Sequence, residues 1–266
     1  MPKSVASNPS IEALMHSSAT RIQARKIELA RIVVEQLRAK LGKDLEAAGV
    51  VGSVARGSAE EYSDIDLLII VKRLRSNVGD VFILDGTYCS VNQKTFDGAL
   101  AELGIPTDFF PEILGGYSRI IPIYDARGLL PKLEERSAAI PHEIFRQSAQ
   151  MALLHSYEDF CRAKNAFLDD DDIVLKDCVD GVTHSAALIV ASLNYAGFES
   201  DREIFKAHRR FQKLPRRFER ITRLRYGNLE CNALFGTLLE FYVELVKFGR
   251  RQGLTFPVRE SSLRRL

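Results

Sequence analysis

The spacing of apolar positions changes near Pro141, and this change predicts two structural regions. Before it, short runs of apolar and β-branched residues alternate with polar turns, a pattern typical of strands. After it, apolar residues recur every three or four positions in 142–164, 177–196 and 228–249, as in amphipathic helices. The sequence therefore predicts an α/β (α+β) domain built on a mixed sheet of about five strands, followed by an all-α helical bundle.

Local signals refine the first region. Its apolar stripe predicts a helix over residues 18–41, and Gly42 stands where a C-terminal cap is expected. Asp85-Gly86 is a hairpin signal because both turn residues must tolerate positive φ, so the strands on either side should be antiparallel. Pro122 cannot donate a ladder hydrogen bond, which places its strand at a sheet edge. The expected strands are 45–51, 65–71, 81–84, 87–93 and 120–124. A short helix from Thr95 to Leu103 is expected between the last two strands.

The change of pattern also sets the expected domain limits. We expect a cleft between the two domains to be the natural ligand site, because clefts between domains are common ligand sites. The predicted divisions are a flexible N-terminus at 1–17, an α/β domain at 18–140, a helical domain at 141–252 and a basic tail at 253–266.

Composition narrows the class of protein only slightly. The chain has 266 residues, with 37 Lys plus Arg against 35 Asp plus Glu, so its net charge of +2 says little about partners. A hydrophobic share of 46% and a charged share of 27% exclude a mainly disordered chain. Apolar runs fall far short of the roughly 20 residues of a membrane helix, no signal peptide is visible, and the cysteines form no C-x-x-C pair. We therefore expect a cytoplasmic protein with no membrane partner.

Residues 50–71 carry the chemistry: a strand, a Gly-Ser turn, a short helical turn and a second strand opened by two aspartates. Gly52 lets the backbone approach a ligand closely, and Ser53 follows where free N–H groups and its own hydroxyl suit a phosphate. Asp64 and Asp66 are two residues apart, so on a strand both carboxylates point to one side. One or two carboxylates plus substrate phosphates are the ligands that Mg²⁺ favours.

This constellation resembles the signature of the polymerase-β-like nucleotidyltransferase superfamily, in its small stand-alone type. The resemblance implies that the Gly-Ser turn holds ATP or another nucleoside triphosphate and that the two aspartates hold Mg²⁺. Arg56 and Ser63 are further nucleotide-binding candidates, and an ion pair of Arg56 with Glu60 or Glu61 is the structural alternative. The residues that carry the resemblance are Gly52, Ser53, Ala55, Arg56, Gly57, Ser63, Asp64 and Asp66.

Two weaker resemblances lie further along the chain. The strand at 120–124, ending in Asp125, looks like the last strand of the stand-alone members. Leu193-Asn194-Tyr195 and the later Leu214-Pro215 resemble the helical domain of aminoglycoside-type nucleotidyltransferases. These likenesses extend the resemblance over most of the chain.

The chain departs from the family pattern at the third carboxylate, which normally stands on the strand after the hairpin. Ser90 or Asn92 occupies that position, and neither serves as a general base at neutral pH. In aminoglycoside-type relatives the helical domain can supply an acidic residue, for which Glu158 and Asp159 are the candidates here. A solvated helix face is the structural alternative for both.

Residues 202–225 hold ten basic and two acidic side chains, a local charge of +8. Such a face could bind RNA or another polyanion with salt-dependent affinity. Pairing with an acidic neighbour such as residues 169–172 is the structural alternative, and those aspartates are expected to open a helix rather than hold a metal. His155 and His184 are expected to be polar core or cleft residues.

Two functions follow from these patterns. The first is Mg²⁺-dependent transfer of a nucleoside monophosphate, AMP by default, to a hydroxyl with release of pyrophosphate. The acceptor is open between a small hydroxylated molecule, a protein side chain and RNA. The second is a catalytically weakened protein of the same fold that binds nucleotide or polyanion, consistent with Ser90 and Asn92. The oligomeric state is also open, a homodimer being one alternative.

Overall fold

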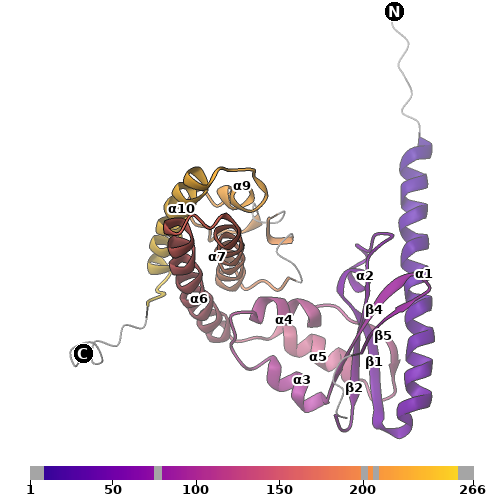
Figure 1. The fold of residues 1–266 in the computed structure, drawn as a ribbon. Helices are drawn as coiled ribbons and strands as arrows, with labels where there is room; N and C mark the ends of the chain where they lie inside the picture. Colours follow the sequence, from indigo (N-terminus) through magenta and orange to yellow (C-terminus); the bar gives the residue numbers. More distant parts are fainter. Residues whose placement is uncertain (1–8, 75–79, 199–202, 206–209, 257–266) are drawn as a thin grey trace, which may run out of the picture. The chain divides into compact units, whose positions relative to one another are not determined.

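The computed structural model describes residues 9–74, 80–198, 203–205 and 210–256, and the chain divides into two compact units (Figure 1). Unit 1 ends at Ala138, close to the predicted boundary, but residues 102–115 belong with the helices of unit 2. Specific contacts explain this assignment: the Phe198 N–H donates to the Pro111 carbonyl at 2.9 Å, and the Phe110 and Phe145 rings meet edge-on with centroids 5.5 Å apart. A single limit at residue 140 does not separate residues 102–115 from unit 1, because the residues that they contact are distant in the sequence.

Unit 1 is built on a five-stranded mixed sheet of order β3-β4-β2-β1-β5. Neighbouring strands are antiparallel except β2 and β4, which are parallel. The five expected strands are confirmed, with Pro122 on the edge strand and Asp85 and Gly86 at φ 49° and 72° in the hairpin turn. The elements are α1 (Pro9–Leu41), the 3₁₀ turn η1 (Gly42–Asp44), β1 (Leu45–Val51), α2 (Gly52–Arg56), β2 (Ile65–Val71), β3 (Asp80–Leu84), β4 (Thr87–Lys94), α3 (Phe96–Glu102), β5 (Ile121–Asp125) and α5 (Leu129–Ala138).

Helix α1 covers one face of the sheet. Its apolar stripe, including Ala30, Val33 and Val34, joins the odd-numbered residues of β2 in one core cluster. Leu68 and Ile70 point to the opposite face and are buried as well, so β2 is covered on both sides, as its nearly continuous apolar run indicates. Of the segment 1–17 that is predicted to be a flexible N-terminus, residues 9–17 lie within α1.

Gly49, in the middle of β1, is a sensitive point of this packing. A Cβ added there would lie 2.5 Å from Ile120 Cγ2 and 3.2 Å from the Ile121 carbonyl oxygen. We expect Gly49→Ala to lower the free energy of unfolding by about 1–3 kcal/mol through overpacking. Gly236→Ala is the control, because its Cβ would meet nothing within 4 Å; it should stabilise its helix by about 0.5–1 kcal/mol. Denaturant unfolding of both variants checks the two signs, and an unchanged Gly49→Ala protein would contradict the packing argument.

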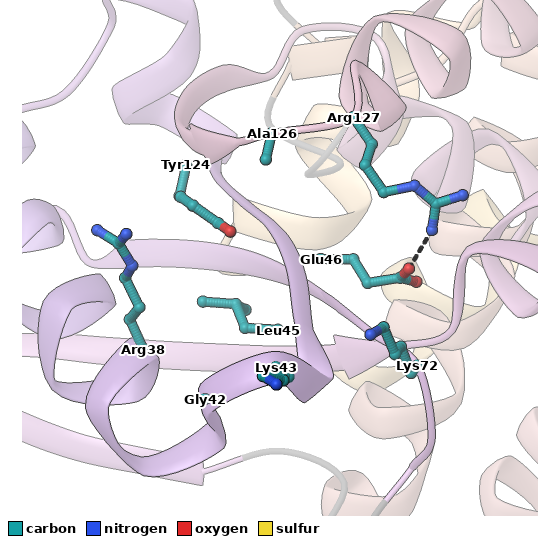
Figure 2. Close-up of a pocket in the computed structure, with 9 residues that line it drawn as sticks. All are labelled: Arg38, Gly42, Lys43, Leu45, Glu46, Lys72, Tyr124, Ala126 and Arg127. Atoms are coloured by element: carbon teal, nitrogen blue, oxygen red, sulfur yellow. Dashed lines mark hydrogen bonds and ion pairs between the residues drawn. The ribbon is translucent and has the colours of Figure 1, made fainter.

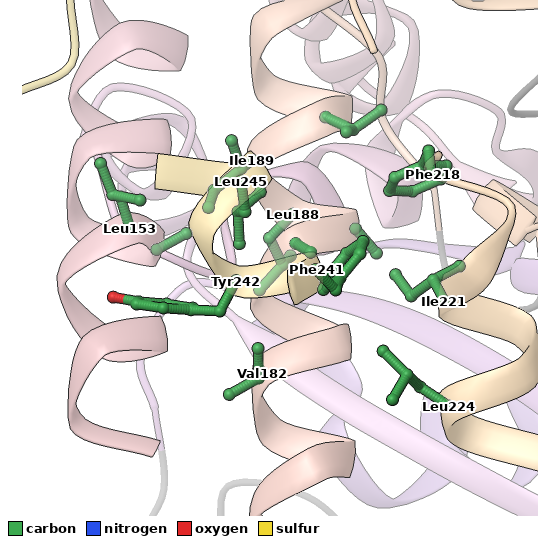
Figure 3. Close-up of a cluster of buried hydrophobic side chains, with 14 of the residues drawn as sticks. Leu153, Val182, Leu188, Ile189, Phe218, Ile221, Leu224, Phe241, Tyr242 and Leu245 are labelled. Atoms are coloured by element: carbon green, nitrogen blue, oxygen red, sulfur yellow. The ribbon is translucent and has the colours of Figure 1, made fainter. Parts of the chain in front are cut away.

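Unit 2 is helical, and no strand occurs in its described residues. Its core, shown in Figure 3, packs Leu153, Val182 and Leu188 against Phe241 and Leu245. The aspartate run opens a helix as predicted, since Asp171 accepts the N–H groups of the first turn at 3.2 and 3.0 Å. The elements are α4 (Phe110–Tyr117, which ends in unit 1), α6 (His142–Leu168), α7 (Asp172–Leu193), α9 (Arg220–Tyr226) and α10 (Cys231–Arg251).

The Leu-Asn-Tyr segment has a structural role in this unit. The Asn194 side-chain amide donates to the Lys213 carbonyl at 2.7 Å and accepts the Lys213 N–H at 3.0 Å. This pair of bonds fixes the chain just before Leu214-Pro215, the second segment of the resemblance. None of the described helices is long and apolar enough to cross a membrane, and all four cysteines are free.

Candidate functional site

The sheet brings the Gly-Ser turn beside the second aspartate. Val51, the last residue of β1, pairs with Asp66 of β2, so the turn that starts at Gly52 begins next to this carboxylate. On its other side Asp66 pairs with Ser90 of β4. The candidate site therefore lies where β1 ends and β2 begins, and its parts meet through strand register.

The Gly-Ser turn has the features that a phosphate site needs. Gly52 is buried with φ 75°, a conformation that residues with a side chain rarely adopt. The Ser53 hydroxyl oxygen is buried and has no hydrogen-bond partner within the described parts of the chain. A buried hydroxyl without a partner is costly, and a phosphate oxygen would satisfy it. Because α2 has only five residues, its helix dipole is small. Phosphate binding at this turn would therefore depend on the backbone N–H groups and on the Ser53 hydroxyl.

The two aspartates provide the acidic side of the site. Asp64 is exposed directly before β2, and Asp66 is partly buried at its second position. Within the described ranges no group of three His, Cys, Asp or Glu side chains could hold a metal ion. A pair of carboxylates beside a phosphate turn fits Mg²⁺, which takes its remaining ligands from substrate phosphates and water. The donor set therefore fits the ion that the fold family implies.

Helix α1 holds the site loops in place, which the sequence did not reveal. Gln23 donates from its side-chain amide to the Val54 carbonyl of α2. Lys26, only 3% exposed, donates from Nζ to the carbonyl of Ser63, the residue before Asp64. A signal was present: Lys26 stands at helical spacing from Leu29 and Ala30, within an otherwise apolar stripe.

Lys26 should also leave a signature in the pH dependence of stability. Burial lowers the pKa of Lys26 from its ordinary 10.5, an effect that Glu61 and Asp64 partly oppose. Between the lowered pKa and 10.5 the unfolded chain binds more protons, so the free energy of unfolding rises with pH. We expect Lys26→Met to lack this rise, whereas Lys40→Met, at an exposed lysine of the same helix, should keep it. Parallel curves for wild type and Lys26→Met in alkaline urea titrations would argue against a buried charge at this position.

The remaining nucleotide-binding candidates take local roles in the loop. The Ser63 hydroxyl accepts the Glu60 N–H at 2.8 Å and closes the turn before Asp64. Glu61 pairs with Arg25 of α1 at 3.3 Å. Arg56 is partly buried at the end of α2. Nucleotide contacts of Arg56 and Ser63 stay predictions.

The register distinguishes the two residues predicted at the third acidic position. Ser90 lies in register with Asp66, whereas Asn92 lies in register with Leu68, further along the strand. Ser90 is the one beside the carboxylates, and its hydroxyl is a poor general base at neutral pH.

Glu158 and Asp159 lie on α6, within unit 2. Burial raises the pKa of Asp159, and the Arg162 guanidinium, 3.4 Å away, opposes this shift. The carboxylate fits against α7 because position 181 is glycine: a Cβ there would lie 2.3 Å from Asp159 Oδ2. Glu158 is exposed. A part for either residue in proton transfer stays a prediction.

The basic segment 202–225 is largely built into the helical unit. Phe205 and Phe218 are buried in its core. Arg220 pairs with Glu240 of α10 and Arg225 with Asp180 of α7, so these two arginines have acidic neighbours, although not within residues 169–172. Residues 202 and 206–209 lie outside the described residues.

Both histidines make polar contacts, but the side chain of His155 is 51% exposed and that of His184 26%, so His155 is not a core residue. His155 Nδ1 lies 2.6 Å from Asp108 Oδ2, and His184 Nε2 lies 3.7 Å from Glu112 Oε1.

The fold and the arrangement of the site resemble those of nucleotidyltransferase domains. The family described as "Nucleotidyltransferase domain" matches residues 30–109, which hold α1 from Ala30, the Gly-Ser turn and both aspartates. This part of the chain is therefore similar to a nucleotidyltransferase domain of the polymerase-β-like kind.

Particular proteins resemble the chain more distantly. An aminoglycoside nucleotidyltransferase (4') of Staphylococcus aureus is 22% identical over 134 residues, covering 50% of this chain and 53% of that one. A provisionally named protein adenylyltransferase of Methanocaldococcus jannaschii is 49% identical over 41 residues, 15% of this chain and 28% of that one. The chain thus spans about half, or less, of the length of these curated relatives.

A solved structure extends the likeness in fold. The nucleotidyltransferase-like protein of Exiguobacterium sibiricum matches with a TM-score of 0.53 at 14% identity, covering 85% of this chain and 75% of its own. A match over 85% of this chain includes residues of both units. At this identity it supports the architecture alone.

Proposed function

We propose that this chain transfers a nucleoside monophosphate, AMP by default, from a nucleoside triphosphate to the hydroxyl of an acceptor. The acceptor oxygen attacks the α-phosphorus, the bond from that phosphorus to the oxygen bridging to the β-phosphate breaks, and pyrophosphate leaves. The hydroxyl proton passes to a base or to water. The observation that carries the proposal is the pairing of Val51 with Asp66, which sets the Gly-Ser turn beside the acidic strand inside the nucleotidyltransferase domain.

Each residue has a defined task in this proposal. The Ser53 hydroxyl and the backbone after Gly52 bind phosphate oxygens, supported by the buried Ser53 oxygen that has no partner among the described residues. Asp64 and Asp66 would hold Mg²⁺, which when bound neutralises phosphate charge and stabilises the charge that develops on the leaving oxygen. Lys26 and Gln23 keep the two loops in position.

The relatives do not identify the acceptor of this chain, because their names point to different acceptors. The Staphylococcus aureus relative is named for action on aminoglycosides and the Methanocaldococcus jannaschii relative for action on protein. Both names describe nucleotidyl transfer, so the common element is the donor half of the reaction. For this chain we propose a hydroxyl acceptor and commit to no particular molecule.

Label partition tests this function without knowledge of the acceptor. The protein is incubated with Mg²⁺, extract of the source cells and ATP labelled either at the α-phosphate or at the γ-phosphate. The α-label should appear on an acceptor and the γ-label in pyrophosphate. Transfer of the γ-label to an acceptor would instead indicate phosphoryl transfer and overturn the proposal.

A second candidate function follows from Ser90. Because this hydroxyl stands in register with Asp66 where a third carboxylate is expected, the chain could bind nucleotide without transferring it. Calorimetry distinguishes the two: ATP binding in the presence of Mg²⁺, with no α-label on any acceptor, would favour the binding protein.

A further inference from the structure

A pocket of about 460 Å³ lies in unit 1, away from the Gly-Ser turn (Figure 2). It opens where α1 ends, at the start of β1 and the ends of β2 and β5. Its lining includes four cationic side chains, one carboxylate and one aromatic ring. These are Arg38, Lys43, Lys72 and Arg127, then Glu46, then Tyr124.

The pocket is separate from the candidate active site. Leu45 pairs with Val71 at the pocket end of β1, whereas Val51 pairs with Asp66 at the site end. Six residues of strand at roughly 3.3 Å each separate the two ends by about 20 Å. Two linked phosphate groups, as in pyrophosphate, are much shorter than this separation and cannot contact both places.

The charges of the pocket are not balanced by its own carboxylate. Glu46, with a side chain only 10% exposed, pairs with Arg127 and holds that guanidinium at the rim. Arg38 lies over the Tyr124 ring at 5.0 Å. Lys43 and Lys72 have no side-chain ion pair or hydrogen bond to any described residue. Arg38 also pairs with Glu35, outside the pocket, at 3.6 Å, so Lys43 and Lys72 are the two pocket cations without a carboxylate partner among the described residues. An anion would offset the repulsion between these neighbouring positive charges.

The end of helix α1 does not account for all four cations. Basic residues near a helix C-terminus interact favourably with its dipole, which explains Arg38 and Lys43. Lys72 follows β2 and Arg127 follows β5, so neither belongs to that helix. Figure 2 shows Arg38 on one side of the pocket and the Lys72 and Arg127 side chains on the other.

We propose that this pocket binds a small ligand that carries two or more linked phosphate groups. Arg38 would contact one phosphate, and Lys72 with Arg127 the next, while Lys43 lies at the floor between them. Arginine and lysine side chains are the usual phosphate partners, and a volume of this size suits a ligand no larger than a nucleotide. The site is independent of the proposed transfer reaction.

Calorimetry of the full chain with inorganic pyrophosphate in EDTA tests this proposal, because chelation removes metal-dependent binding at Asp64 and Asp66. The double variant Lys43→Gln/Lys72→Gln should weaken pyrophosphate binding by about ten-fold or more. The matched control Arg119→Gln/Lys132→Gln removes two exposed charges of the same unit outside the pocket and should change binding by less than about two-fold. The variant Asp64→Asn/Asp66→Asn should bind pyrophosphate with the affinity of the wild type.

Four results would overturn the proposal, three of them from the pyrophosphate titrations. The first is absence of pyrophosphate binding at millimolar concentration. The second is an equal loss of pyrophosphate affinity in the pocket and control variants, and the third is a loss of this affinity in Asp64→Asn/Asp66→Asn. A single-stranded RNA that binds through Lys43 and Lys72 when pyrophosphate does not would also overturn it, since the pocket would then be part of a nucleic-acid surface. Circular dichroism melting of each variant checks that the fold is intact.

Discussion

Asp66→Asn is expected to lower nucleotidyl transfer by about 100- to 1000-fold, the scale of losing one preorganised electrostatic contact at a reacting phosphate. Asn keeps the size of the side chain but removes the charge that would attract Mg²⁺. Because the variant also removes repulsion from Asp64 two residues away, its melting temperature in EDTA should be unchanged or higher. Transfer of the α-label and thermal melting, measured on the same preparation, check both halves of this expectation.

Glu135→Gln is the matched control for Asp66→Asn. It makes the same neutralising change at an exposed carboxylate of α5 in the same unit. Its transfer rate should equal that of the wild type. Undiminished transfer by Asp66→Asn would remove this carboxylate from the mechanism. A loss of transfer accompanied by a clearly lower melting temperature would instead point to a structural role.

Ser53→Ala is expected to separate binding from stability. The Ser53 hydroxyl oxygen is buried without a partner in the described structure, so its removal should leave the free energy of unfolding unchanged or raise it by about 1 kcal/mol. If the hydroxyl donates to a triphosphate, the same change should weaken ATP binding about ten-fold, the loss of one hydrogen bond to a charged group. Calorimetry and denaturant unfolding measure the two quantities.

Ser58→Ala provides the comparison at nearly the same place. Its hydroxyl is exposed and lies 3.4 Å from the Ser53 carbonyl oxygen. Loss of this hydroxyl should change neither ATP affinity nor stability by more than about two-fold or 0.5 kcal/mol. A Ser53→Ala protein that is clearly destabilised, yet binds ATP normally, would show that the hydroxyl serves the fold.

The strands, the hairpin and one edge of the sheet follow from local patterns in the sequence, whereas the complete strand order, with β2 beside β4, does not. The dense apolar run of β2 identifies a strand buried on both faces, Asp85-Gly86 identifies the hairpin, and Pro122 identifies the edge. The Gly-Ser turn and the aspartates are equally local, because their roles depend on spacing within about a dozen residues. These features were predictable because a short window contains the whole physical reason for each.

Features that depend on distant partners were not predictable in the same way. Lys26 is 37 residues from Ser63, and nothing near it in sequence indicates that its ammonium group reaches that carbonyl. The fit of Asp159 against Gly181 joins two helices, and the clamp of Asn194 on Lys213 spans 19 residues. The grouping of residues 102–115 with the helices has the same origin. In each case the sequence supplies a suitable side chain but not its partner.

A crystal structure of the chain with Mn²⁺ and a non-hydrolysable triphosphate analogue tests the central claim most directly, because manganese can be located by anomalous scattering. The account predicts the ion against the carboxylates of Asp64 and Asp66, with the triphosphate within hydrogen-bond distance of the Ser53 hydroxyl. A triphosphate bound elsewhere in unit 1, with no ion at the two aspartates, would contradict it.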